Sequence, residues 1–268
     1  GSRKTLLINN LAVHRVTRKK KLPVVLFEPN ELQLFSNGPD KRRDFLDELL
    51  EMLYLEYGSI RRQYRRSLSQ RNRLLKTQPS NVGKQLFVWD IRLSELGGQI
   101  VAYRQRLIND FNKDLPAVYR ALSASSVPTL VAYPSSINGA DYSSALLHKL
   151  EQHVELDLMR GFTAYGPHRD DMQASIAGHS LQDSASRGEI RTLILAIKII
   201  QIQMVERAYG AKALLLFDDV FSELDAKRRR LLTKLISRDH QTFITTTNAD
   251  VVVSTLKNKH TIIPITKS

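Results

Sequence analysis

The chain has 268 residues and carries 40 lysine and arginine side chains against 27 aspartate and glutamate, a formal net charge of +13. Hydrophobic residues make up 42% of it, which is enough for a packed core and excludes a wholly disordered chain. There is no cysteine, so disulfides, thiol chemistry and cysteine-based zinc sites are excluded.

The positive charge is concentrated toward the N-terminus. Residues 1–120 hold 23 basic and 12 acidic side chains, whereas residues 121–268 hold 17 and 15. Such a distribution favours a polyanionic partner, either nucleic acid or an anionic membrane surface. Because no apolar run approaches the roughly 18–20 residues that span a bilayer, nucleic acid is favoured and a cytoplasmic location is expected. Gly1-Ser2 resembles a protease-cleavage scar, so we expect the natural polypeptide to start upstream.

The chain is predicted to open in β structure and then become helical. Short alternating or apolar runs predict strands at residues 5–8, 11–16 and 24–27, with Asn9-Asn10 as a hairpin turn. Pro39-Asp40 marks the start of a helix, because apolar residues recur at helical spacing up to Leu53, and Gly58 is expected to end it.

The most basic segment follows, at residues 59–76. It contains seven cations and no acid, a pattern suited to neutralising backbone phosphates, although a solvated helix face is the alternative. The cations are Arg61, Arg62, Arg65, Arg66, Arg71, Arg73 and Lys76. A further helix is expected over residues 83–120, with a kink at Gly97-Gly98 and a second interruption at Pro116. Trp89 on this helix is interpreted as a packing residue, with base stacking as the alternative.

Strands and helices alternate after residue 125. Strands are predicted at 129–133, 172–176, 213–217, 242–246 and 261–265, and helices at 143–160, from 190 to 204, at 225–237 and at 251–256. Strand–helix alternation with apolar strands indicates an α/β fold with a parallel or mixed sheet covered by helices. We therefore expect three parts: a β part at 1–38, a helical basic arm at 39–125 and an α/β lobe at 126–268.

Two segments carry candidate chemistry. The apolar run 213–217 ends in Asp218-Asp219, and a buried parallel strand delivers such carboxylates to the sheet edge, where they can hold Mg²⁺ beside phosphates. An acidic turn that caps the next element is the alternative. Ser186 with Glu189 forms a capping box for the following helix. The same helix start also suits a terminal phosphate, and the two interpretations are compatible.

In this order and spacing, the two segments resemble the signature and Walker B motifs of ABC-type ATPases, and more closely those of the RecF family. The stretch 216–228 is similar to that family's Walker B and D-loop. Three more blocks agree: residues 29–47, the basic helix with Tyr64 and Gln70-Arg71-Asn72, and Gly166-Pro167-His168-Arg169-Asp170-Asp171. The resemblance spans nearly the whole chain.

The resemblance implies an ABC-type ATPase head with an inserted helical arm, using ATP and Mg²⁺. It implies recombination repair of single-strand gaps, with duplex DNA and single-strand/duplex junctions, RecO, RecR and RecA as partners, and a homodimer when ATP is bound. It assigns Asp218 to Mg²⁺ and Asp219 to the base or water-orienting group. Ser186, Gly188 and Arg191 would contact ATP held by a second subunit, Ser222 and Asp225 would form the D-loop, and Asn248 the switch.

The sequence also departs from the family pattern. Asn30, Arg187, Glu189 and Asn248 differ from the usual residues, and the switch role of Asn248 is weakened most. No GxxxxGK[ST] phosphate loop occurs in the sequence, so the chain as given is expected to be inactive as an ATPase.

Other functions remain open on the sequence alone. One alternative is a metal-dependent phosphodiesterase that uses Asp218 and Asp219 with Asp170 or Asp171. Another is a non-catalytic scaffold that binds DNA or RecR. For residues 168–171, we expect a structural Arg–Asp arrangement rather than a metal site.

Overall fold

The computed structural model describes residues 6–8, 11–13, 21–137, 139, 141–236, 240–254, 256 and 260–265. The expected turn at Asn9-Asn10 lies outside these residues. The chain divides into two compact units, one made of residues 1–32 and 201–268 and the other of residues 33–200. We call them the sheet unit and the helical unit. The three-part division expected from sequence stays a prediction.

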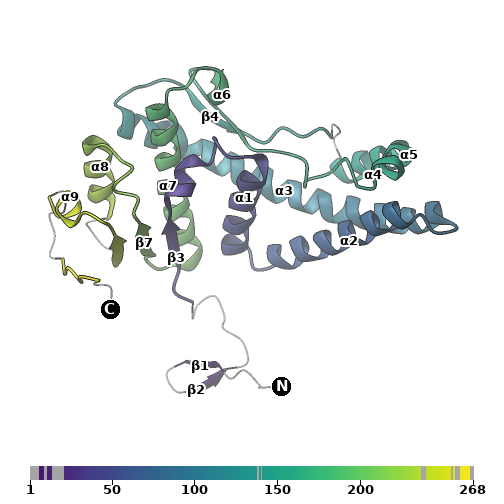
Figure 1. The fold of residues 1–268 in the computed structure, drawn as a ribbon, viewed down its shortest axis with the longest axis horizontal. Coiled ribbons are helices and arrows are strands. Elements are labelled where there is room, and N and C mark those ends of the chain that lie inside the picture. Colours follow the sequence, from purple (N-terminus) through teal and green to yellow (C-terminus); the bar gives the residue numbers. More distant parts are fainter. Residues whose placement is uncertain are drawn as a thin grey trace. The chain divides into compact units, whose positions relative to one another are not determined.

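The sheet unit is built on three parallel strands, β3 (Val24–Phe27), β7 (Leu214–Asp218) and β8 (Thr242–Thr245), in the order β3-β7-β8 (Figure 1). Alternate side chains of the strands pack on one face, where the Phe27 and Phe217 rings stack with centroids 5.6 Å apart. Helices α8 (Ala226–Ile236) and α9 (Ala249–Val253) follow β7 and β8. Parallel pairing brings the ends of β7 and β8 to one edge of the sheet.

The structure confirms a strand pair predicted near the N-terminus and contradicts a strand predicted at residues 261–265. Strands β1 (Leu6–Ile8) and β2 (Leu11–Val13) pair antiparallel with Leu6 opposite Val13, so the described parts of the first two predicted strands are confirmed. Residues 261–265 were expected to form a last strand, but they lie in no strand and are exposed. An apolar β-branched run makes a strand only where a neighbour supplies backbone hydrogen bonds.

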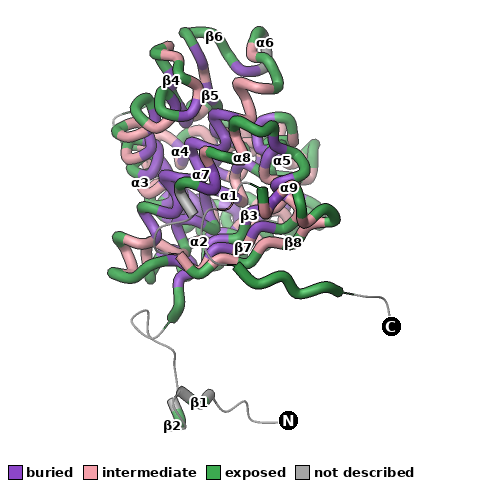
Figure 2. Tube along the Cα trace, turned by 90° about the vertical axis from the view of Figure 1, so that its left-hand side faces the viewer, coloured by how far each residue is buried: buried purple, intermediate pink, exposed green. Residues whose placement is uncertain are grey.

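Three helices form the body of the helical unit: α1 (Pro39–Leu53), α2 (Tyr57–Thr77) and α3 (Val82–Ser123). Helices α2 and α3 pack side by side. Buried residues, purple in Figure 2, recur along both helices. The first helix was expected to end at Gly58, but α1 already ends at Leu53, and Gly58 lies in the first turn of α2. The interruption expected at Pro116 is absent, because α3 continues as one helix through Gly97-Gly98 and Pro116. Packing along the whole of α3 compensates for the hydrogen bond that proline removes.

The rest of the helical unit is a small antiparallel sheet with further helices. Strands β4 (Thr129–Ala132), β5 (Gln173–Ile176) and β6 (His179–Ser180) pair in that order. The helix predicted over 143–160 is two helices, α4 (Tyr142–Gln152) and α5 (Val154–Arg160), separated at His153. Helices α6 (Leu181–Ser184) and α7 (Arg187–Tyr209) follow, and α7 continues into the sheet unit.

The observed architecture confirms the predicted fold class, a mixed α/β fold with a parallel sheet and flanking helices. In the part of the chain that the structure describes, the helices are too short or too polar to cross a bilayer.

Candidate nucleotide and nucleic-acid sites

Two acidic residues end strand β7 at the sheet edge. The Asp218 side chain is exposed, and its Oδ1 accepts a hydrogen bond of 2.6 Å from Oγ1 of Thr245 at the end of β8. The backbone N–H of Asp219 donates to both O and Oγ1 of the same threonine, each at 3.1 Å. Thr245 therefore fixes the two acids, a role that sequence analysis missed; the pairing of β7 with β8 is the signal that reveals it.

The conformation of Asp219 is unusual. Its φ of 49° lies in the left-handed region, which aspartate tolerates better than most residues but still at a cost. Its Oδ1 is buried and has no hydrogen-bond partner among the described residues. A buried carboxylate oxygen without a partner is costly, so this atom is a candidate for contact with a group that the chain itself does not supply.

The donor set at this edge fits a magnesium–nucleotide group. Mg²⁺ prefers oxygen ligands and is commonly held by one or two carboxylates together with waters and substrate phosphates. Asp218 offers an exposed carboxylate, and Asp219 offers the oxygen that lacks a partner. The residues present therefore suit the group that the sequence implies.

Other predicted residues of the sheet unit have clear local roles. Ser222 donates from Oγ to the backbone O of Asp219 at 2.7 Å, which places it in the same turn. Asp225 caps the start of α8 by accepting from the Arg228 N–H at 2.8 Å, and this hydrogen bond lowers the pKa of its carboxyl. Asn248 caps α9 by accepting from the Val251 N–H at 3.3 Å. Asp218, Asp219 and Ser222 are thus brought together.

The signature residues lie at the start of α7, in the helical unit. Oγ of Ser186 donates to Glu189 Oε2 at 2.7 Å and accepts from the Glu189 N–H at 3.2 Å, which confirms the capping box. Hydrogen bonds from Ser186 lower the pKa of Glu189. Gly188 and Arg191 occupy the first two turns behind this cap, partly exposed. The predicted helix start is present, and its nucleotide role stays a prediction.

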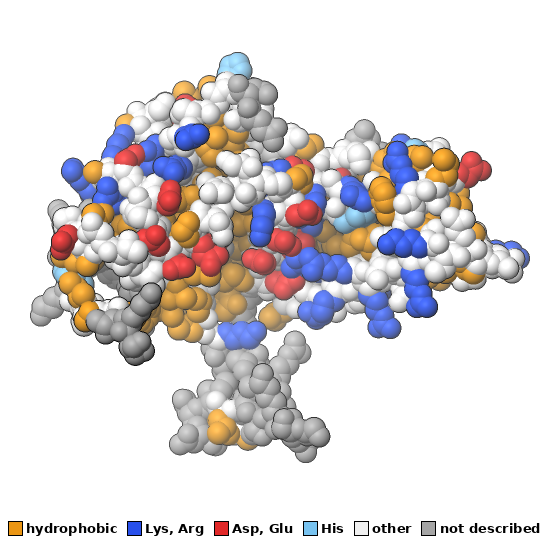
Figure 3. Space-filling model, in the orientation of Figure 1, with side chains coloured by type: hydrophobic (Ala, Val, Ile, Leu, Met, Phe, Trp, Pro, Cys, Tyr) orange, Lys and Arg blue, Asp and Glu red, His pale blue; other side chains and the backbone are white. Residues whose placement is uncertain are grey.

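The seven predicted DNA-binding cations on α2 fall into two groups. Five are exposed and belong to one side of the helix, although one of them, Arg65, also pairs with Asp44 of α1 at 3.4 Å. The other two are engaged in ion pairs inside the helical unit. The exposed five are Arg62, Arg65, Arg66, Arg73 and Lys76. Lysine and arginine side chains gather along α2, on the right of the view in Figure 3. Residues between Arg65 and Thr77 also line an open depression of about 540 Å³.

Arg71 does not belong to the exposed surface. Its side chain is fully buried and pairs with Asp90 at 2.5 Å and Asp157 at 2.6 Å, and it donates to Thr163 Oγ1 at 2.9 Å. Burial raises the pKa of Asp90 even with this partner. We therefore remove Arg71 from the predicted DNA-binding set, because a polyanion cannot reach it.

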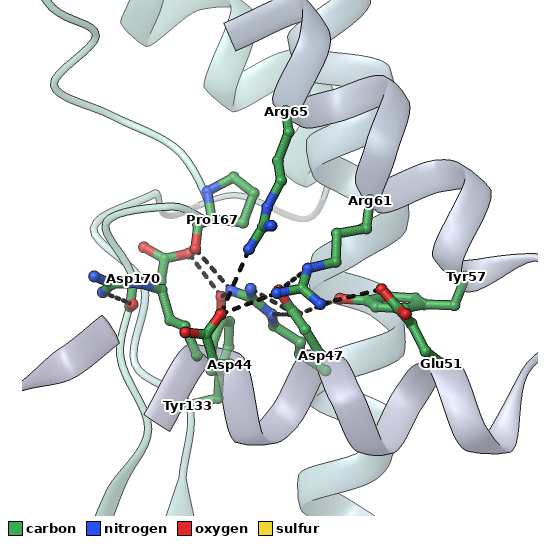
Figure 4. A network of polar contacts seen from close by, with 11 residues as sticks. Asp44, Asp47, Glu51, Tyr57, Arg61, Arg65, Tyr133, Pro167 and Asp170 are labelled. Carbon is green, nitrogen blue, oxygen red and sulfur yellow. Dashed lines mark hydrogen bonds and ion pairs between the residues drawn. The ribbon is translucent and has the colours of Figure 1, made fainter. Parts of the chain in front are cut away.

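Arg61 is also engaged within the protein. It reaches from α2 toward three acids of α1, and Figure 4 shows it among them. Its ion pairs are 2.9 Å to Asp44, 3.0 Å to Asp47 and 3.1 Å to Glu51, and its side chain is only 11% exposed. Three carboxylates around one guanidinium leave no excess positive charge there, so Arg61 is also removed from the set.

The element at residues 168–171 is a structural network, as expected. Arg42 donates to both carboxylate oxygens of Asp171 at 2.8 Å. Asp170 is buried, which raises its pKa, and its Oδ2 accepts from Ser135 at 3.0 Å and from two tyrosines. Among the described residues, no group of three or more histidine, aspartate or glutamate side chains could hold a metal ion.

His168 shows which ring nitrogen carries the proton. Its Nε2 lies 3.1 Å from the backbone O of Thr163, which can only accept, and its Nδ1 lies 2.7 Å from the hydroxyl of Tyr64. Nε2 therefore carries the hydrogen, and Tyr64 donates to Nδ1. Burial lowers the pKa of His168 to about 4, so the ring is neutral at physiological pH.

The chain is similar to proteins of known name over most of its length. It is 34% identical to the DNA replication and repair protein RecF of Alkaliphilus oremlandii (strain OhILAs), over 88% of this chain and 65% of the relative. It is 32% identical to the RecF protein of Acetivibrio thermocellus, over 94% of this chain and 70% of that relative. The chain thus spans about 65% of the length of the first of these relatives.

A solved structure shares the fold. It is the structure of the recombination mediator protein RecF-ATPrS in the RecFOR pathway, with a TM-score of 0.80 and 27% identity over 92% of this chain and 69% of that one. The structure of the recombination mediator protein RecF-ATP in the same pathway gives a TM-score of 0.77 and 25% identity, over 92% of this chain and 68% of that one. No protein-family model matches the chain.

Proposed function

The chain belongs to the RecF family of DNA replication and repair proteins, and from this premise we propose that its helical unit binds the phosphate backbone of DNA through α2. The observation that carries the proposal is the exposed row of five cations on this helix, Arg62, Arg65, Arg66, Arg73 and Lys76. Helix α2 itself contains no acidic residue, and the acid paired with Arg65, Asp44, belongs to α1.

The spacing of these cations suits a polyanion. Residues three, four and seven positions apart share a face of an α-helix, and the row from residue 62 to residue 76 extends over about 21 Å. Guanidinium and ammonium groups bind phosphate oxygens and release condensed counterions, and they do so without reading sequence. We therefore propose binding that is sequence-independent and strongly dependent on salt.

We further propose that the edge of β7 serves ATP. Asp218 would hold Mg²⁺, and Asp219 would orient or deprotonate an attacking water, because its backbone is fixed by Thr245 and its Oδ1 has no partner among the described residues. The magnesium ion would neutralise charge on the phosphates. Ser186, Gly188 and Arg191 would serve a nucleotide held by a second copy, with Ser222, Asp225 and Asn248 in supporting loops.

The proposed cellular role follows the family. A form of the protein with a phosphate-binding loop would dimerise on DNA when ATP is bound and would act with RecO, RecR and RecA at single-strand gaps, in the cytoplasm at the nucleoid. The present sequence has no GxxxxGK[ST] motif, so we propose that this chain binds Mg·ATP weakly and acts as a DNA- or RecR-binding scaffold. Titration calorimetry that gives micromolar or tighter affinity would overturn the statement about ATP.

Charge reversal tests the DNA-binding proposal. Lys76→Glu places a negative charge in the exposed row, so the affinity for a 30-base-pair duplex should fall at least tenfold in fluorescence anisotropy at low salt. The matched control is Lys113→Glu on α3, because Lys113 is 71% exposed and already pairs with Asp110. Equal losses for the two variants would reject α2 as the binding face.

A further inference from the structure

An exposed aromatic ring lies where α5 ends. Phe162 is 38% exposed and follows Gly161, whose φ of 72° ends the helix in the left-handed conformation. The guanidinium carbon of Arg169, itself an exposed residue, lies 4.9 Å from the centroid of the Phe162 ring. The ring and the guanidinium group therefore form a solvent-accessible cation–π pair.

Hydrogen bonds tie this pair to helix α2. Nε and one terminal nitrogen of Arg169 both donate to the backbone O of Thr163 at 3.4 Å. The N–H and Oγ1 of Thr163 in turn donate to Oδ1 of Asn72, at 2.8 Å and 2.7 Å. Thr163 is buried, so the pair is attached to α2 through a fixed residue.

The pair borders the surface that carries the exposed cations. Asn72 lines the open depression together with Arg65, Arg73 and Lys76. A Cβ placed on Gly161 would lie 3.3 Å from Cγ of Lys76, and Nε2 of Gln78 donates to the backbone O of Leu158 at 3.0 Å. The end of α5 and the end of α2 are therefore in direct contact.

An exposed ring in a basic surface has a specific chemical use. Each nucleobase has a flat π face that stacks on phenylalanine rings and on arginine guanidinium planes. Inside a duplex, these faces are covered by neighbouring base pairs, and only the terminal pair at a blunt end exposes one, so an unpaired base is the occupant that such a platform favours. Cations beside the ring can hold the phosphates that flank that base.

We propose that Phe162 and Arg169 form a stacking platform for an unpaired base beside the cations of α2. Junctions of single strand and duplex are already implied by the family resemblance; what the structure adds is the pair of residues that would contact the unpaired base there. This inference rests on the DNA binding proposed above.

The test compares two DNAs with the 268-residue chain. One is a blunt duplex and the other is the same duplex with a short single-stranded extension that contains 2-aminopurine, whose emission falls when it stacks. The wild type should bind the extended DNA more tightly and quench its emission. Phe162→Ala should lower affinity for the extended DNA by roughly fivefold to a hundredfold and leave blunt-duplex affinity unchanged.

Three further variants separate stacking from charge and from folding. Phe162→Trp should keep the preference, whereas Phe162→Leu, which keeps an apolar side chain, should lose it. Arg169→Lys keeps the charge and loses the planar group, so it should weaken quenching. Met159→Ala is the control, because Met159 is 84% exposed near the end of the same helix and has no aromatic ring.

The failures of the two proposals are distinguishable. A wild type that binds both DNAs equally and leaves 2-aminopurine emission unchanged would overturn the stacking platform while DNA binding stands. The same conclusion holds if Phe162→Ala and Phe162→Trp behave alike. A wild type that binds neither DNA would overturn the proposed function, and the platform with it.

Discussion

Arg71 and Arg73 lie two positions apart on α2, yet one is fully buried and the other is exposed. The difference arises from partners distant in sequence, because Asp90 and Asp157 meet the guanidinium of Arg71 inside the helical unit. A buried arginine between two carboxylates cannot be replaced cheaply, since its loss leaves the acids without compensation. Arg71 thus supports the surface that its neighbours form.

Substitution of Arg71 should therefore be far more damaging than substitution of Arg73. Arg71→Met should lower the free energy of unfolding by about 3–5 kcal/mol, the usual cost of breaking a buried ion pair on one side. Arg73→Met should change it by less than about 0.5 kcal/mol, as an exposed substitution does. Urea unfolding followed by circular dichroism measures both, and similar midpoints for the two variants would contradict this assignment.

His168 makes the stability of the helical unit dependent on pH. Its pKa is lowered to about 4 by burial, whereas in the unfolded chain it is about 6.5. Between these values the unfolded state binds more protons, so stability is present above pH 6.5 and is lost as pH falls toward 4. The stabilisation at pH 5 should be about 2 kcal/mol smaller than at pH 7.

A His168→Gln variant isolates this effect. Burial raises the pKa of Asp90 and Asp170, and a raised carboxyl pKa makes stability fall as pH rises, which is opposite to the effect of His168. Both acids are present in the wild type and in the variant, so their contribution cancels in the comparison. The difference in unfolding free energy between wild type and variant should therefore shrink from pH 7 to pH 5. A difference that stays constant over this range would show that His168 is not buried in its neutral form.

At the scale of elements, the start of α7 combines a structural and a proposed functional role. Ser186 and Glu189 satisfy each other's backbone groups as a capping box. The hydroxyl that a nucleotide would contact is therefore the same group that begins the helix. Loss of nucleotide-dependent behaviour in a Ser186 variant has meaning only when its effect on stability is known.

Ser186→Ala should lower the free energy of unfolding by about 1 kcal/mol, because the N-cap hydrogen bond is lost. Ser186→Thr keeps a capping hydroxyl, so its free energy of unfolding should fall by only a few tenths of the decrease expected for Ser186→Ala. The control is Ser184→Ala, at an exposed position ahead of the cap. Thermal unfolding of the three variants would refute the capping role if Ser186→Ala and Ser184→Ala were indistinguishable.

At the scale of the whole molecule, most strands and helices could be predicted from the sequence because apolar periodicity is a local signal, although the strand expected at 261–265 is absent. The acids at the end of β7, the capping box and the parallel sheet were likewise predicted from local residue patterns. Which cations stay exposed could not be predicted, because acids of other helices pair with Arg61 and Arg71. The platform at Phe162 is likewise formed by a residue seven positions away in a folded loop.

The two units carry different proposed functions, DNA binding in the helical unit and nucleotide binding in the sheet unit. The helical unit presents the exposed cations of α2, and the sheet unit presents Asp218 and Asp219 at its edge. The central claim is that the five cations bind DNA by neutralising phosphates. Its consequence is a defined dependence of affinity on salt, since each phosphate contact contributes about 0.9 to the slope of log affinity against log salt concentration.

The most direct test is therefore the salt dependence of duplex binding by the wild type and by Arg73→Gln, measured by fluorescence anisotropy between 50 and 200 mM salt. Five contacts predict a slope of about −4.5 for the wild type, and the loss of one contact predicts a slope of about −3.6 for the variant. A wild-type slope near zero, or the same slope for both proteins, would contradict the claim that the exposed face of α2 holds the DNA backbone.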